Sequence, residues 1–132
     1  MAQTQPSTAP LPELGGPALR AFFALSERWE LRAAEQRTLL GDPPESTFYK
    51  WKREQDGHIG RDTIERISYL LGIYKDLAIL FPDPAQAEGW VRRPNTAPLF
   101  GGRSALERML SGNVADLFVV RQYLDAQRGW NG

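Results

Sequence analysis

Apolar side chains recur three and four positions apart along this chain, and glycine or proline interrupts each run after a few turns. No segment alternates apolar and polar residues with the β-branched enrichment that is typical of strands. The first apolar run places one set of residues on a single helical face: Leu19, Phe22, Phe23 and Ser26. The pattern therefore predicts an all-α protein whose core is built from the stripes of several short helices.

The glycines, prolines and small polar residues predict where these helices begin and end. We expect helices from Pro17 onward, over 33–40 up to Gly41, from Asp42 to Gly57 or Gly60, over 62–81 with an interruption at Gly72, from Asp83 toward Trp90, from Ser104 onward, and after Asn113. Residues 1–16 are rich in Gln, Pro, Thr and Ala and show no apolar period. We expect this segment to be a disordered tail.

Side-chain acceptors at helix starts follow a D-x-x-E or S-x-x-E pattern, in which each side chain accepts from a backbone N–H group of the first turn. Three pairs fit this pattern: Asp42 with Glu45, Asp62 with Glu65, and Ser104 with Glu107. Arg32 departs from it, because arginine has no acceptor and stands where a serine or threonine is expected before the helix at 33–40. We expect a locally weaker helix start there.

The length of 132 residues suits one compact domain or two very small ones that share a core. The chain has no cysteine and a single histidine, His58, so disulfides, thiolate metal sites and histidine-built zinc sites are not expected. We expect no cofactor. No apolar run approaches the roughly 20 residues of a membrane span, and the N-terminus is unlike a signal peptide. A cytoplasmic protein is the simplest expectation.

An enzyme is not expected either, because catalysis needs titratable groups that converge. The carboxylates are scattered along the chain, and several are expected as helix caps. His58 stands alone in a predicted loop. Gly101-Gly102 is followed by Arg-Ser and no strand precedes it, so it does not resemble a phosphate-binding loop.

Two short helices joined by the tight turn at 39–44 predict a helix-turn-helix. In the second helix, Phe48 and Trp51 share an inward face. The outward residues are the candidate DNA contacts: Ser46, Thr47 and Tyr49 near base edges, and Lys50, Lys52 and Arg53 at phosphates. A plain helical bundle with a solvated face remains open, because residues 45–61 carry four cations against three carboxylates and the whole chain has a formal net charge of 0.

Self-association would double the charge that such a module presents to DNA. The segment 62–81 carries more apolar positions than one small core can use. We expect a homodimer through one set of these residues: Tyr69, Ile73, Tyr74 and Leu77.

The last third of the chain is not needed to complete a simple DNA-binding domain. Pro94-Asn95 predicts a turn, and Phe100 is an aromatic residue in a loop relieved by Gly101 and Gly102. Aromatic and arginine residues tend to concentrate the binding energy of interfaces. We therefore expect a dedicated protein-binding module, with candidate contacts at Pro94, Asn95, Phe100, Arg103, Arg121, Arg128 and Trp130.

An ordered series of short motifs in the second half resembles the Xre/MbcA/ParS antitoxins: 66–74 (RISYLLGIY), Leu80-Phe81-Pro82, Trp90, Pro94-Asn95 and Phe100-Gly101. The resemblance covers roughly residues 17–130. It implies an Xre-like helix-turn-helix and dimerisation domain over 17–81 and a toxin-binding domain over 82–132. It also implies a cognate toxin encoded beside the chain, most often a RES-domain enzyme that consumes NAD, whose active site the antitoxin blocks while the pair represses its own operon.

A second hypothesis is a stand-alone helix-turn-helix transcriptional regulator whose C-terminal half only dimerises. Such a regulator needs no partner to bind its operator. An antitoxin instead forms a tight complex with a co-encoded toxin.

Overall fold

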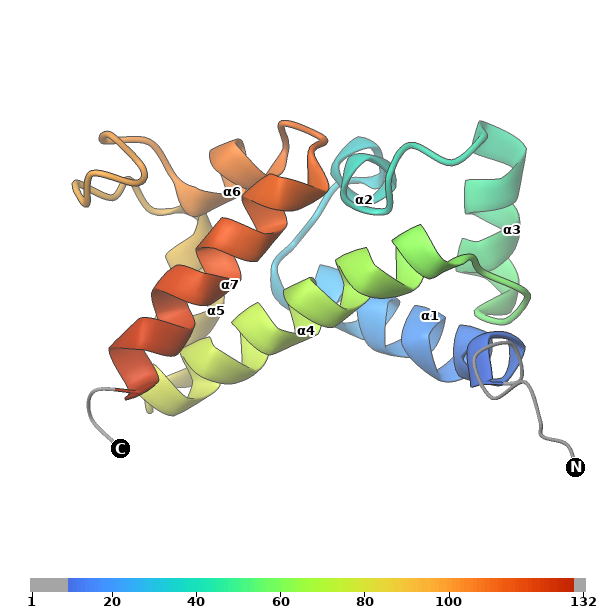
Figure 1. Ribbon diagram of the computed structural model, residues 1–132, viewed down its shortest axis with the longest axis horizontal. Coiled ribbons are helices and arrows are strands. Elements are labelled where there is room, and N and C mark those ends of the chain that lie inside the picture. The colour runs from blue at the N-terminus through green and yellow to red at the C-terminus, as the bar shows by residue number, and fades with distance from the viewer. Residues whose placement is uncertain (1–9, 130–132) are drawn as a thin grey trace, which may run out of the picture.

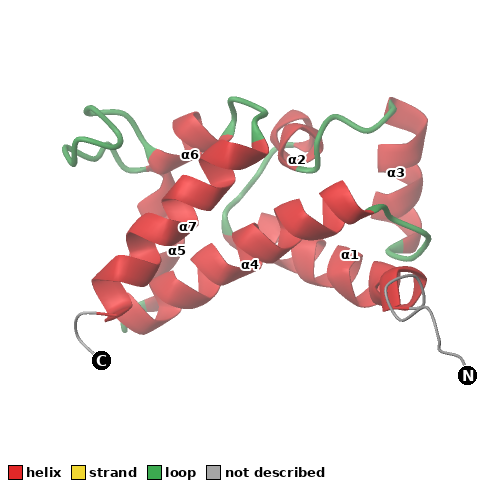
Figure 2. Ribbon diagram, viewed as in Figure 1, coloured by secondary structure: helices red, strands yellow, loops and turns green. Residues whose placement is uncertain are grey.

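The computed structural model describes residues 10–129 as a set of helices, and no β-strand occurs in that range (Figure 2). In chain order the elements are α1 (Pro10–Arg28), α2 (Ala33–Leu39), α3 (Glu45–Glu54), α4 (Arg61–Leu80), α5 (Pro84–Gly89), the 3-10 helix η1 (Trp90–Arg92), α6 (Ala105–Met109) and α7 (Val114–Gly129). The predicted all-α architecture, with a helix-turn-helix followed by a small helical domain, is confirmed.

Helix α4 is the central element of the molecule, with α1 packed on one part of it and α7 on another (Figure 1). Three residues on its inner face, Ile67, Leu70 and Ile73, are fully buried. They join one continuous apolar core that runs from Leu19 on α1 to Leu124 on α7. A continuous core of this kind makes the two halves of the chain one packed body.

Several predicted helix limits hold. Helix α2 stops at Leu39 before Gly41, α4 ends ahead of Pro82, and α5 starts after Asp83, whose side chain accepts from the Ala85 N–H at 3.1 Å. At α6 the predicted capping box forms: the Glu107 N–H donates to the Ser104 hydroxyl at 3.1 Å, and the Ser104 N–H donates to the Glu107 carboxylate at 3.0 Å. All four residues of the first predicted stripe are buried.

The two aspartate caps are wrong. Asp42 adopts a left-handed conformation, and α3 begins three residues later with Pro44 as the preceding residue and no side-chain cap. Gly60 precedes α4, and Asp62 pairs with Arg66 one turn along at 3.0 Å instead of capping. An ion pair between residues four apart competes for a carboxylate that the sequence pattern assigns to the backbone.

Helix α1 begins at Pro10, so residues 10–16, predicted as tail, are helical, and Pro17 lies inside the helix. The tail prediction for residues 1–9 lies outside the described residues. A Cβ at Gly15 would collide with the carbonyl oxygen of Gly57, so Gly15 allows α1 to pass close to the backbone of the loop after α3.

Gly72 does not interrupt α4, which runs without a break from Arg61 to Leu80. Its missing side chain instead makes room for the guanidinium group of Arg121 on α7, which any Cβ at this position would strike. Helix α3 ends before the predicted glycines, at Gln55, which takes a left-handed conformation. In the part of the chain that the structure describes, no helix is long and apolar enough to cross a membrane.

Candidate functional site

Helix α3 lies at one end of the molecule and the loop between η1 and α6 lies at the other (Figure 1). On α3, Phe48 and Trp51 are buried as predicted. Among the six candidate DNA contacts, Thr47 is half-buried. The other five are exposed: Ser46, Tyr49, Lys50, Lys52 and Arg53. Ser46, Tyr49, Lys50 and Arg53 share the outermost side of α3, with Thr47 and Lys52 at its two edges.

Packing fixes how this face is held. The Phe48 ring contacts the Phe23 ring of α1 at a centroid distance of 6.2 Å, and the Tyr49 ring lies against Phe48 at 4.9 Å. The ammonium group of Lys52 lies 5.8 Å from the centre of the Phe48 ring. The end of α3 is tied to α1 by Arg20, which donates to the Gln55 carbonyl at 3.5 Å. Aromatic packing on one side and the Arg20 contact at its end thus hold α3 firmly against α1.

The loop at 93–104 is closed by backbone contacts at its base. Pro94 and Ser104 form an isolated antiparallel bridge, and the Asn95 N–H donates to the Arg103 carbonyl at 3.0 Å. The Asn95 side chain accepts from the Ala97 N–H at 2.9 Å, so the predicted Pro-Asn turn is present. The residues at its outer positions are exposed: Pro94, Thr96, Pro98, Gly101, Gly102 and Arg103.

Arg108 of α6 stiffens the same loop. Its guanidinium group donates to the Leu99 carbonyl at 2.8 Å and to the Asp116 carboxylate of α7 at 2.9 Å. A hydrogen bond from Ser111 lowers the pKa of Asp116, burial acts against it, and Arg108 lowers the pKa further. A loop held in this way loses little conformational entropy when it binds a partner.

The prediction that Phe100 is a direct contact for a partner needs correction, because the residue is only 5% exposed. Its ring packs edge-on against Trp90 at 5.8 Å and against Tyr123 of α7 at 5.4 Å. Phe100 therefore anchors the loop to its own domain. Leu99 and Arg103 lie beside it around a shallow cavity of about 250 Å³.

Two of the predicted toxin contacts on α7 are engaged within the chain. Arg128 donates to the Asp76 carboxylate of α4 at 2.9 Å, and Arg121 lies over Gly72 with its Nε 3.4 Å from the Asp125 carboxylate. Both side chains are partly exposed, so their outer edges stay accessible. Trp130 lies outside the described residues. The structure thus brings Pro94, Asn95, Phe100 and Arg103 together in one loop and places Arg121 and Arg128 at the α4–α7 contact.

Two of the four predicted dimer residues are buried in the core, and two keep some exposed surface. Ile73 and Leu77 are 0% and 1% exposed and belong to the core of the chain, so they cannot form a surface between two copies. Tyr69 and Tyr74 are half-buried and lie toward different neighbours, Phe118 of α7 and Trp29 directly after α1. The apolar excess of 62–81 is used by α1 on one side and α7 on the other.

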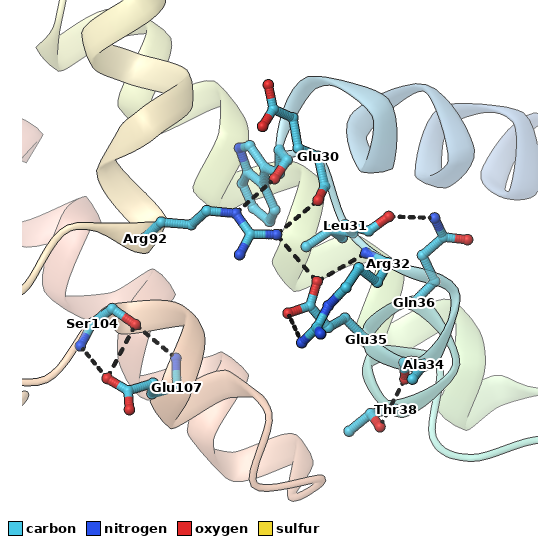
Figure 3. A network of polar contacts seen from close by, with 11 residues as sticks. Glu30, Leu31, Arg32, Ala34, Glu35, Gln36, Thr38, Arg92, Ser104 and Glu107 are labelled. Carbon is cyan, nitrogen blue, oxygen red and sulfur yellow. Dashed lines mark hydrogen bonds and ion pairs between the residues drawn. The ribbon is translucent and has the colours of Figure 1, made fainter.

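A polar network that sequence patterns do not reveal joins the corner between α1 and α2 to η1 (Figure 3). Arg92 donates to the Trp29 carbonyl at 3.1 Å, to the Glu30 carbonyl at 2.7 Å and to the Glu35 carboxylate at 3.1 Å. Burial tends to raise the pKa of Glu35, but hydrogen bonds from Arg32 and Arg92 outweigh it and lower the pKa. The only signal in the sequence is a glutamate three residues after a helix start, and that signal does not name its distant partner.

Comparisons with known proteins identify both halves of the chain. Residues 11–72 match the antitoxin Xre-like helix-turn-helix domain, and residues 76–129 match the antitoxin Xre/MbcA/ParS C-terminal toxin-binding domain. The chain belongs to the Xre/MbcA/ParS antitoxin family. It is also 52% identical over 111 residues to the "Uncharacterized protein y4oB" of Sinorhizobium fredii (strain NBRC 101917 / NGR234), covering 84% of each chain.

The two matched segments meet inside α4, between residues 72 and 76. The sequence prediction instead places the boundary after residue 81, at the end of this helix. Helix α4 thus serves both domains. Neither of the two matched families is a family of enzymes.

Proposed function

We propose that this protein is the antitoxin of a type II toxin–antitoxin system, which binds and blocks a cognate toxin and represses its own operon through operator DNA. The observation that carries the proposal is the pairing, in one packed body, of an antitoxin helix-turn-helix domain with a toxin-binding domain of the same family. The two candidate surfaces lie at opposite ends of the molecule, so both partners can bind at once (Figure 1).

For DNA, we assign α3 to the major groove. Ser46, Thr47 and Tyr49 contact base edges, and the exposed cations Lys50, Lys52 and Arg53 contact phosphates. A homodimer presents two copies of this helix, as an operator with two half-sites requires. Tyr69 and Tyr74 are the members of the predicted dimer set that keep exposed surface.

For the toxin, we assign the loop 93–104 as the inhibitory element. It is exposed at Pro94 and Arg103 and rigidly held at its base by Asn95 and Arg108. The loop covers the entrance to the toxin's active site, and Arg103 pairs with toxin carboxylates. The exposed edges of Arg121 and Arg128, at the α4–α7 contact, are further candidate toxin contacts.

For the toxin's class, we propose a RES-domain enzyme that consumes NAD. This choice rests on the family resemblance. We place the protein in the cytoplasm, where an operator-binding bacterial protein meets its DNA.

The test uses reciprocal charge reversals at the two ends of the molecule. Arg103→Glu and Lys50→Glu change the same charge on exposed residues far from each other. Each variant is co-expressed with the toxin encoded beside it, from an inducible promoter that does not depend on autorepression. Growth and co-purification report on toxin binding, and anisotropy of a duplex covering the protein's own promoter reports on DNA binding.

We expect Arg103→Glu to lose growth rescue and keep DNA binding, and Lys50→Glu to do the opposite. Wild type that binds the promoter fully but neither rescues growth nor co-purifies with the neighbouring gene product would make the protein a stand-alone regulator. Loss of both functions in both variants would contradict the assignment of separate surfaces. Truncation of α7 is a poorer test, because it removes Leu124 from the core.

A further inference from the structure

Arg92 reaches out of the segment matched as toxin-binding domain and into the segment matched as helix-turn-helix. Its three acceptors, the carbonyls of Trp29 and Glu30 and the carboxylate of Glu35, lie 57 to 63 positions away in the sequence. A guanidinium group is suited to this role because it presents several donors in one rigid plane. Figure 3 shows the group placed between the end of α1 and the start of α2.

The corner that Arg92 fills lacks a side-chain cap at the start of its second helix. Helix α1 itself ends in an ordinary left-handed turn at Glu30, with φ of 55°, in which the Glu30 and Leu31 N–H groups donate to the Glu27 and Ser26 carbonyls at 3.1 and 2.9 Å. The Trp29 and Glu30 carbonyls of this turn accept from Arg92. Arg32 stands at the N-cap of α2 and has no side-chain acceptor. The Glu35 carboxylate accepts from the Arg32 N–H at 2.8 Å, but it is 5% exposed and needs cations to balance its charge.

From this corner, side-chain contacts continue to α3. Gln36 of α2 donates to the Leu31 carbonyl at 2.9 Å, which fixes α2 to the corner. Arg37, the next residue, donates to the Pro43 carbonyl at 2.7 Å, directly before the start of α3. These contacts link α2 to the segment that leads into the first turn of α3, which α1 also holds through Phe23 and Arg20.

On the other side, Arg92 is two residues ahead of Pro94, where the loop 93–104 begins. A partner that holds this loop therefore acts close to the backbone that carries the guanidinium group. One side chain thus lies between the proposed toxin surface and the polar contacts that hold α2 and α3.

We propose that Arg92 is a positioning residue through which the toxin-binding domain sets α2 and α3 for operator binding, so that toxin bound at the loop changes operator affinity. The inference rests on the proposed function and adds the residue that carries the coupling. Coupling of this kind is an energy shared by two sites, and it is measured as a ratio of affinities.

The first measurement compares Arg92→Met with Arg93→Met in binding to a duplex from the protein's own promoter. Arg93 is the matched control, because it is adjacent and its guanidinium donates within its own domain, to the Gln86 carbonyl at 2.7 Å. We expect Arg92→Met to weaken operator binding by about tenfold or more, because charged hydrogen bonds are lost at a buried carboxylate. Arg93→Met should stay within about twofold of wild type. Circular dichroism verifies that each variant is folded.

The second measurement restores the corner without Arg92. Arg32→Ser supplies an acceptor for the N–H of residue 35, and Glu35→Gln keeps the reciprocal acceptor while removing the buried charge. Added to Arg92→Met, the two changes build a neutral capping box at the start of α2. We expect the triple variant to recover operator binding to within about threefold of wild type, which restored stability elsewhere in the chain would not achieve.

The third measurement adds the toxin encoded beside the gene. In wild type we expect operator affinity to differ between the free protein and the toxin complex, and in the triple variant we expect that ratio to fall close to one. An unchanged ratio in the triple variant overturns the coupling. So does Arg92→Met with normal operator binding, or a loss that the capping box does not restore.

Failure of the proposed function gives a different result. If wild type binds no promoter DNA, hydrogen exchange still reports on the corner, because Arg92→Met should lose protection at the first-turn amides of α2 and keep it in α7. Uniform loss of protection in both helices would show that Arg92 serves only global stability and would overturn the inference.

Discussion

Two buried carboxylates each pair with an arginine from the C-terminal part of the chain, Glu35 across the two matched segments and Asp76 within the second one, and they are compensated very differently. Glu35 on α2 receives the Arg32 N–H at 2.8 Å, the Arg32 side chain at 3.2 Å and Arg92 at 3.1 Å. Asp76 on α4 receives Arg128 at 2.9 Å on one oxygen, while its other oxygen is buried without a hydrogen-bond partner among the described residues. Each side chain lies opposite an arginine from the C-terminal part of the chain.

The pKa values move in opposite directions as a result. Burial tends to raise the pKa of Glu35, but its hydrogen bonds and the charge of Arg92 lower it. At Asp76, burial and the neighbouring Asp125 carboxylate raise the pKa more than Arg128 lowers it. An arginine facing a buried carboxylate is therefore not sufficient to stabilise a fold. The remaining lone pairs must also be satisfied.

The largest expected effect on stability is at the ion pair between Glu35 and Arg92. Arg92→Met leaves the Glu35 charge with only the exposed Arg32 and removes the donor to the Trp29 and Glu30 carbonyls directly after α1. We expect the free energy of unfolding to fall by about 2 kcal/mol in urea denaturation followed by circular dichroism. The adjacent Arg93→Met should cost less than about 0.5 kcal/mol. Equal losses in the two variants would show that the contacts of Arg92 at the corner stabilise the fold no more than those of an ordinary surface arginine.

A second prediction concerns pH at the same link. The folded pKa of Glu35 lies below its unfolded value of 4.5, so its stabilisation is present above that value and is lost as pH falls through the folded pKa. Glu35→Gln should cost about 1 kcal/mol at pH 7 and flatten the loss of stability on the acid side. Urea unfolding at several pH values measures both. An acid-side slope as steep as that of wild type would contradict the role of Glu35.

The comparison also shows what sequence reasoning reaches. The first helix stripe, the inward Phe48 and Trp51 and the Ser104–Glu107 box depend on neighbours within one or two turns, and the structure confirms them. Arg92 and Arg128 could not be paired with their carboxylates, because more than 50 residues separate the partners and only the packing of α4 brings them together.

For the candidate site, too, predictions from local patterns held better than predictions from residue type. The outward residues of α3 followed from helical period alone, whereas Phe100 and Ile73 were assigned to surfaces by residue type and lie in the core. An aromatic or apolar residue gives no indication of whether its own chain or a partner covers it. The loop at 93–104 was nevertheless recognised, because the Pro-Asn turn and the two glycines are local signals.

The third prediction inverts the sign of the first. The folded pKa of Asp76 is raised above its ordinary value of 3.8, so the protonated form stabilises the fold and that stabilisation is lost as pH rises through the folded pKa. Asp76→Asn keeps an acceptor for Arg128 and adds donors beside Asp125. We expect a gain of about 0.5–1 kcal/mol at pH 7 and little change at low pH. A clear loss of stability at pH 7 would show that Arg128 stabilises the charged Asp76 carboxylate, as Arg92 and Arg32 stabilise that of Glu35.

The smallest effect is expected at Gly72, beside the same α4–α7 contact. Alanine in place of glycine inside a helix stabilises it by about 0.5–1 kcal/mol, but a Cβ here strikes the guanidinium group of Arg121. That group is the far end of a flexible side chain whose other contacts are long, 3.5 Å to the Ser68 carbonyl and 3.4 Å to Asp125. Gly72→Ala alone should therefore change the free energy of unfolding by less than about 0.5 kcal/mol.

Removing Arg121 separates the two opposing contributions at this position. In an Arg121→Ala background the new methyl group meets no guanidinium group, so Gly72→Ala should show the helical gain of about 0.5–1 kcal/mol. A double-mutant cycle in urea measures the difference as a coupling energy between the two residues. A coupling of zero would mean that the Arg121 side chain moves aside for the methyl group without loss.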